Sequence, residues 1–175
     1  MTSDITVYAK WTAVYAIRDT GPAGGLIFYD KGIYSDGWRY LEAAPSDEST
    51  HGLQWYNGTY TTIATGTAIG TGQANTTTIV TSQGAGSYAA LWCNDLTIGG
   101  FSDWFLPSKD ELNQMYLNLR VAGVGGFDNA SYWSSSEIDT TRAWAQYFRT
   151  DNDPPGVQQA VYKELDPLVR AVRAF

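Results

Sequence analysis

The chain has 175 residues, a formal net charge of −7 and only 17% charged residues, but it contains 7 Trp and 12 Tyr. The acidic balance argues against nucleic acid as a partner, because affinity for a phosphate backbone depends on many Lys and Arg contacts. A single cysteine, Cys93, and a single histidine, His51, exclude an internal disulfide and leave few ligands for a soft metal. We therefore expect no metal and no cofactor.

Residues 1–13 differ in character from the rest of the chain. They alternate in the manner of a short strand around Ile5–Tyr8, and ITVYAKWT is similar to the closing strand of the internalin-type B repeat of bacterial surface proteins. This similarity predicts that residues 1–13 are the remnant of an upstream repeat or a linker, and that residues 14–175 form the domain. An ordinary first strand of the domain is the alternative.

Two strands are predicted after the glycine-rich turn GPAGG. The apolar run Leu26–Tyr29 is typical of a buried strand, and Trp38–Glu42 alternates as the second strand of a hairpin. From Thr50 to Asn94 no Asp, Glu, Lys or Arg occurs. We expect a long neutral loop there, followed by helical turns around Ala74–Ser82 and Ser87–Asp95.

The clearest helix is Ser108–Arg120, followed by three further strands. Ser108 and Glu111 match a capping box, in which two side chains satisfy backbone N–H groups at the helix start. Apolar residues then occur at helical spacing: Leu112, Met115, Tyr116 and Leu119. Strands are predicted at Ser131–Glu137, Ala143–Phe148 and Leu168–Phe175, the last pairing with the strand at Leu26–Tyr29. The elements predict an α+β fold with two short helices packed on small antiparallel sheets.

Catalytic and metal-binding patterns are weak. Ser134–Ser136 precede Glu137, but only His51 is available as a base. Asp151 and Asp153 suit calcium, yet the loop that begins at Asp151 has Tyr162 at its twelfth position, where an EF-hand needs Glu. We interpret that loop as a solvated turn and the chain as a protein without enzyme activity.

The C-terminal third separates regular from irregular stretches. YWSSSE, AW and VRAVRAF are regular and apolar. Between them, the residues without helical or strand period are Ile138–Thr141, Ala145, Tyr147 and Arg149–Val157. Irregular residues held on a rigid scaffold are typical of binding surfaces. We predict one contiguous exposed face above buried Trp133, Trp144 and Phe148. Its residues are Asp139, Thr140, Thr141, Ala145, Tyr147, Thr150, Asp151, Asp153, Pro154, Pro155, Val157, Val161, Leu165 and Asp166.

Motifs along most of the chain resemble one family. GGFSDWFLPS, the Glu111-Leu112 pair, YWSSSE, AW and VRAVRAF occur in the order found in the bacterial Lcl-C domain, named after a collagen-like adhesin. The resemblance runs from about Ile17 to Phe175. It implies a C-type-lectin-like fold related to formylglycine-generating enzymes. Those enzymes use a pair of cysteines, so the resemblance does not imply their activity here.

The resemblance implies two binding roles. In the variable proteins of diversity-generating retroelements, errors at template adenines rewrite C-terminal codons, and the pattern YWSSSE, AW-x-Q-x-F and Arg-Ala-Val-Arg is similar to this chain. AAC codons altered at adenine never encode Trp, Lys, Glu or Gln. The resemblance therefore implies that residues of these types belong to the invariant framework, among them Trp133, Glu137, Trp144, Gln146 and Lys163. The alternative role is an invariant adhesin domain that binds sulfated or other surface polysaccharides.

Both roles imply that the binding partner is extracellular. We expect a protein or glycan ligand on another cell or host surface, and no nucleic acid. We expect no direct membrane insertion, because no apolar run is long enough to cross a bilayer. The resemblance also implies display on a bacterial cell surface or a phage particle.

Overall fold

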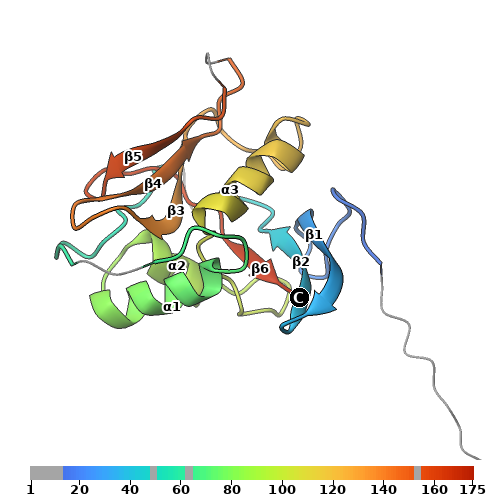
Figure 1. Cartoon of the computed structure of the whole chain (residues 1–175), viewed down its shortest axis with the longest axis horizontal. Helices are drawn as coiled ribbons and strands as arrows, with labels where there is room; N and C mark the ends of the chain where they lie inside the picture. The colour runs from blue at the N-terminus through green and yellow to red at the C-terminus, as the bar shows by residue number, and fades with distance from the viewer. Residues whose placement is uncertain (1–13, 48–50, 62–64, 152–154) are drawn as a thin grey trace, which may run out of the picture.

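The computed structural model describes residues 14–47, 51–61, 65–151 and 155–175. It contains two three-stranded antiparallel sheets and three short α-helices (Figure 1). The predicted α+β class is confirmed, but the predicted number of two helices is wrong. The strands are β1 (Leu26–Ser35), β2 (Trp38–Ala43), β3 (Ser131–Glu137), β4 (Arg142–Tyr147), β5 (Gln158–Tyr162) and β6 (Val172–Ala174).

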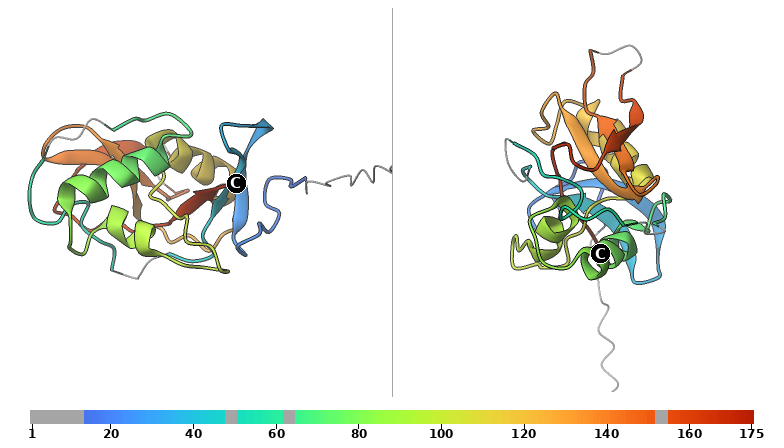
Figure 2. Two further views of the ribbon diagram at one scale, coloured as in Figure 1. Left: turned by 90° about the horizontal axis from the view of Figure 1, so that it is seen from below. Right: turned by 90° about the vertical axis from the view of Figure 1, so that its left-hand side faces the viewer.

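The first sheet has the order β1-β2-β6 and joins the two ends of the described chain. β2 pairs antiparallel with β6, with Leu41 opposite Ala174 and Ala43 opposite Val172. The terminal strand therefore lies in the same sheet as β1, as predicted, but its direct partner is β2. The reason is that the β1–β2 hairpin leaves the far edge of β2 open for the returning chain. Both described ends lie at this side of the molecule (Figure 2).

The second sheet has the order β3-β4-β5 and lies at the opposite end of the molecule (Figure 2). β3 has the predicted boundaries, whereas no strand was predicted at the position of β5. β3 is buried on both faces, because Tyr132 packs into one hydrophobic cluster and its neighbour Trp133 into the other. β5 forms the outer strand and pairs only with β4 among the described strands.

The helices α1 (Gly72–Gln83), α2 (Ala89–Asp95) and α3 (Lys109–Met115) cover the sheets, and a π-helical turn comes directly after α3. The predicted capping box is present: the Ser108 backbone N–H donates to Glu111 Oε2 at 2.7 Å. The predicted apolar face of this helix is buried. Among the helices of the described ranges, none has the length and apolar character required to cross a bilayer.

Buried ion pairs connect the C-terminal segment to the rest of the domain. Arg170 is 1% exposed, and its Nε donates to Asp47 Oδ1 at 2.6 Å while its guanidinium lies over the Phe127 ring. Arg173 donates to both Asp103 oxygens, at 2.8 and 2.9 Å, and contacts Glu42. Each buried cation thus has a carboxylate partner, the arrangement that buried charge requires.

A third buried cation supports the second sheet. Lys163 is fully buried beyond the end of β5, and its ammonium lies 2.5 Å from a Glu137 oxygen at the end of β3. The same ammonium lies 4.4 Å from the Trp55 ring centroid and donates to the Thr61 carbonyl. These contacts fix the chain that leaves β5 against β3.

Candidate functional site

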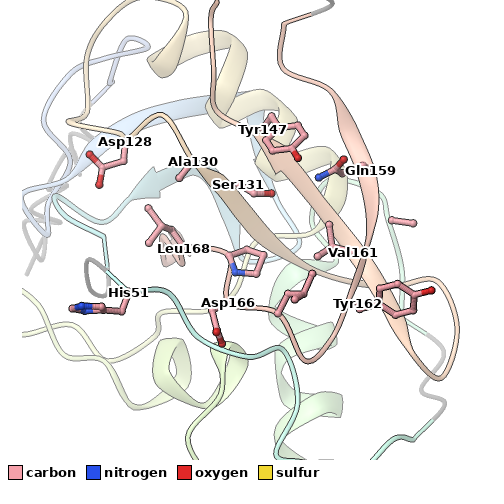
Figure 3. A pocket seen from close by; sticks show the side chains of 13 residues that line it. His51, Asp128, Ala130, Ser131, Tyr147, Gln159, Val161, Tyr162, Asp166 and Leu168 are labelled. Carbon is pink, nitrogen blue, oxygen red and sulfur yellow. The ribbon is translucent and has the colours of Figure 1, made fainter. Parts of the chain in front are cut away.

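A pocket of about 550 Å³ opens beside the β3-β4-β5 sheet (Figure 3). The sheet forms one wall, and the segment that leads from β5 toward β6 forms the other. The volume lies within the range of small-molecule and peptide-anchor sites in proteins. The lining residues are His51, Asp128, Ala130, Ser131, Tyr147, Gln159, Ala160, Val161, Tyr162, Leu165, Asp166, Pro167 and Leu168.

Strand register explains why the sheet wall has this composition. Ser131 of β3 lies opposite Tyr147 of β4, and Ala145 of β4 lies opposite Gln159 of β5. Residues directly opposite each other point to the same face, and alternate residues of one strand share a face. Ser131, Tyr147, Gln159 and Val161 therefore point to the same side, where the pocket opens.

The pocket has an apolar floor and a partly aromatic rim. Leu168 is 6% exposed and Val161 is 8% exposed, so both form the floor. Tyr162 is 56% exposed and Leu165 is 51% exposed, and both line the rim. Large side chains that remain this accessible beside a pocket provide contact area that packing of the domain does not use.

The polar groups of the pocket are mainly acidic. Asp128 and Asp166 are exposed, and neither forms an ion pair with any residue of the described ranges. The lining contains no Lys or Arg. Ser131 Oγ is buried in the wall and has no hydrogen-bond partner within the described part of the chain. Figure 3 places the two tyrosines on the strand side, with Asp128 and His51 across the pocket from them.

The structure distributes the predicted face over three places. Tyr147, Val161, Leu165 and Asp166 line the pocket. A second group occupies the β3–β4 turn: Asp139, Thr140 and Thr141. A third group belongs to the β4–β5 connection: Thr150, Asp151, Pro155 and Val157. The second and third groups are separated by the length of β4, which is about 20 Å for six residues. Asp153 and Pro154 lie outside the described residues.

Two predicted surface residues are buried. Ala145 is 1% exposed and Val161 is 8% exposed. Both belong to the hydrophobic cluster that contains Trp55 and Trp133, because the pocket-facing side of β4 and β5 continues inward as the core. The prediction that every member of the face is exposed is therefore wrong at these positions.

The three aromatic residues predicted to lie beneath the face differ in how deeply they are buried. Trp133 and Phe148 are fully buried, as predicted. Trp144 is only partly buried, on the opposite side of β4, where the Lys109 ammonium lies 4.5 Å from its ring centroid. The expectation that Trp144 lies largely buried beneath the face is wrong, because alternation along β4 turns it away from the core.

The β3–β4 turn is fixed by one carboxylate. Asp139 Oδ1 accepts hydrogen bonds from the backbone N–H groups of Thr141 and Arg142, at 2.9 and 2.8 Å. Asp139 Oδ2 accepts from the Arg142 guanidinium, which holds the pKa of Asp139 well below its ordinary value. Although partly exposed, the Asp139 carboxylate is thus fully engaged in hydrogen bonds within its own turn.

Several pocket residues were not predicted, among them Asp128, Gln159 and Tyr162. Gln159 and Tyr162 were missed because no strand was predicted at residues 158–162. The sequence QQAVY contains Val and Tyr, which favour strands, and that signal is present in the sequence. Asp128 and His51 carried no signal, since they reach the pocket only through the tertiary fold.

The serine cluster considered for catalysis is structural. Ser134, Ser135 and Ser136 are fully buried. Their hydroxyls donate to the carbonyls of Trp144, Pro107 and Gly66 respectively. Across the described ranges, no group of three or more His, Cys, Asp or Glu side chains is arranged to hold a metal ion.

Comparisons with known proteins do not assign the chain to a family. No family model matches its sequence, and no curated protein matches it significantly. The C-type-lectin-like fold and the family inferred from the motifs thus stay predictions, whereas the α+β architecture is established by the elements themselves.

Proposed function

We propose that this chain is a ligand-binding domain, a receptor or adhesin module displayed on a bacterial cell or phage particle, whose recognition surface centres on the pocket beside β4 and β5. The observation that carries the proposal is a contrast between two sets of charged side chains, one buried and paired and the other exposed and, among the described residues, unpaired. Lys163, Arg170 and Arg173 are buried and paired, while Asp128 and Asp166 are exposed at the pocket and lack ion-pair partners in the described ranges.

The arrangement also supports the diversified-surface form of this function. Tyr147, Leu165 and Asp166 line the pocket without being fully buried. Their replacement is compatible with folding, because a partly exposed side chain contributes little to the core. The motifs also resemble those of variable proteins of diversity-generating retroelements. This resemblance implies that the codons at these positions differ between variants of the gene.

The alternative, an adhesin for sulfated polysaccharides, has less support. A polyanion requires a basic surface, but the pocket lining contains two aspartates and no Lys or Arg. Arg142 and Arg149 lie near the two ends of β4, and each has an aspartate of its own loop within ion-pair distance, at 2.6 and 3.6 Å.

The proposal is tested by selection on the immobilised domain. Random peptides displayed on phage and an array of sulfated and neutral glycans are screened against the wild-type domain and a Tyr147→Ala/Leu165→Ala variant. We expect specific binders of the wild type that the variant loses. A matched control, Ile33→Ala/Tyr34→Ala, alters two exposed apolar residues of β1 and should retain the binders. Binders whose affinity is the same for the pocket variant and the wild type, or a lack of binders among both peptides and glycans, would contradict the proposal.

A gene-level observation tests the diversification separately. We expect a reverse transcriptase gene close to the coding sequence, together with an adenine-rich near-copy of its 3′ end. Differences between the two copies should fall at codons such as those of Tyr147 and Leu165, and spare those of Trp133 and Lys163. Identical copies, or differences in the framework codons, would leave an invariant binding domain as the function.

A further inference from the structure

We infer that the pocket binds a peptide segment of a protein ligand in which a Lys or Arg side chain stands next to an apolar one. This inference rests on the proposed function and specifies the chemistry of its ligand. The first argument is electrostatic. Asp128 and Asp166 line the pocket with no Lys or Arg among the lining residues. Two carboxylates without compensation favour a cation and disfavour any polyanion.

The described basic residues form no ion pair with Asp128 or Asp166. Arg120, which lies beside Asp128 in the fold, donates instead to the Phe127 carbonyl and the Asn129 side chain. Arg142 is held by Asp139 across its own turn, and Arg149 lies 3.6 Å from Asp151 of its own loop. Lys163 is the nearest basic residue to Asp166 in the sequence, but it is fully buried against Glu137. The positive charge that the pocket lacks is therefore expected from the ligand.

Aromatic and apolar groups define the rest of the ligand. Tyr147 shares the pocket face of the sheet with Gln159 and Val161 (Figure 3), and a tyrosine ring attracts Lys and Arg head groups through its face. The floor formed by Val161, Pro167 and Leu168 is apolar and buried. A Lys or Arg side chain suits this combination, because its methylene stem contacts apolar surface while its head remains near water and carboxylates.

Two polar groups of the wall favour a peptide over a small cation. Ser131 Oγ is buried in the wall and lacks a hydrogen-bond partner within the described residues. Gln159 contributes an amide, which can both donate and accept. Both suit the alternating N–H and C=O groups of a peptide backbone. The pocket volume of about 550 Å³ also exceeds what one side chain fills, so neighbouring residues of the same segment are expected to enter.

The experiment uses the peptides selected on the wild-type domain. Their dissociation constants are measured by calorimetry for the wild type, for Asp128→Asn/Asp166→Asn, and for the charge-matched control Asp36→Asn/Asp95→Asn, whose residues are exposed and lie outside this pocket. We expect Lys and Arg to be enriched beside apolar residues. The pocket variant should bind about three- to tenfold more weakly, the control less than about twofold, and added salt should reduce the difference. Thermal unfolding of each variant confirms that it is folded.

The outcomes separate this inference from the proposed function. Peptides that need Tyr147 and Leu165 but show no basic enrichment, or that bind the Asn variant as well as the wild type, would overturn the inference and leave the function standing. Pocket-dependent binding of a sulfated glycan, with no peptide selected, would have the same meaning. Loss of all pocket-dependent binding would remove both.

Discussion

Two sets of charged side chains in this domain have opposite surroundings. In the framework, Lys163, Arg170 and Arg173 are buried, each within ion-pair distance of a carboxylate and stacked near an aromatic ring. At the pocket, Asp128 and Asp166 are exposed, and the lining contains no Lys or Arg. Buried ion pairs thus hold the framework in one structure, whereas the two exposed carboxylates of the pocket remain available to a partner.

The strongest test of the comparison removes one framework cation. Lys163→Met should lower the free energy of unfolding by about 3–5 kcal/mol, because Glu137 would stay buried without its cation. Urea unfolding monitored by tryptophan fluorescence measures the change. The double variant Lys163→Met/Glu137→Gln should recover at least about 1 kcal/mol of this loss, since it removes the buried charge. A loss below about 1 kcal/mol in the single variant would show that the pair does not hold the framework.

A smaller effect is expected where the pocket wall becomes core. Ala145→Tyr should cost about 1–3 kcal/mol, because Ala145 is 1% exposed within the cluster around Trp133 and a larger side chain overpacks it. Thermal unfolding, compared with Tyr147→Ser two residues further along β4, provides the measurement. If Ala145→Tyr were as stable as the wild type, residue 145 would tolerate substitution and would not belong to the core framework.

The Asp139 turn predicts a pH-dependent effect at the surface. The Arg142 guanidinium lowers the pKa of Asp139 in the folded state. The stabilisation is therefore present above the unfolded value of about 3.8 and is lost as pH falls toward the folded value. Carboxyl-carbon NMR should show Asp139 still ionised below pH 3.8, and Arg142→Ala should raise its pKa. Titration of Asp139 at the ordinary value would contradict this account of the turn.

The smallest change is expected at the pocket rim. Leu165→Ser/Asp166→Ser should shift the free energy of unfolding by less than about 1 kcal/mol, because both residues are exposed and substitutions at such positions cost about 0.5 kcal/mol or less each. Calorimetric unfolding measures this, and ligand selection should change at the same time. A loss of stability as large as that of the framework variants would show that the rim residues also support the fold.

Local patterns in the sequence predicted several elements well. The capping box at Ser108 and Glu111 and the apolar helix face next to it depend on residues within a few turns of each other. β3 was predicted with its observed boundaries. β5 was missed because its five residues lack a clear alternation of apolar and polar types and adjoin a loop rich in Pro and Asp.

Sequence patterns were sufficient to predict the α+β class, the buried residues Trp133 and Phe148, and a C-terminal third in which regular and irregular stretches alternate. Which irregular residues lie together depends on the folded arrangement of the strands. This arrangement placed Tyr147, Val161, Leu165 and Asp166 around one pocket with Asp128 and His51, and placed the turn at Asp139 at the end of β4 opposite to Tyr147. The physical reason is that periodicity and capping depend on near neighbours, whereas the pocket depends on strand register and on ion pairs between residues far apart in the chain.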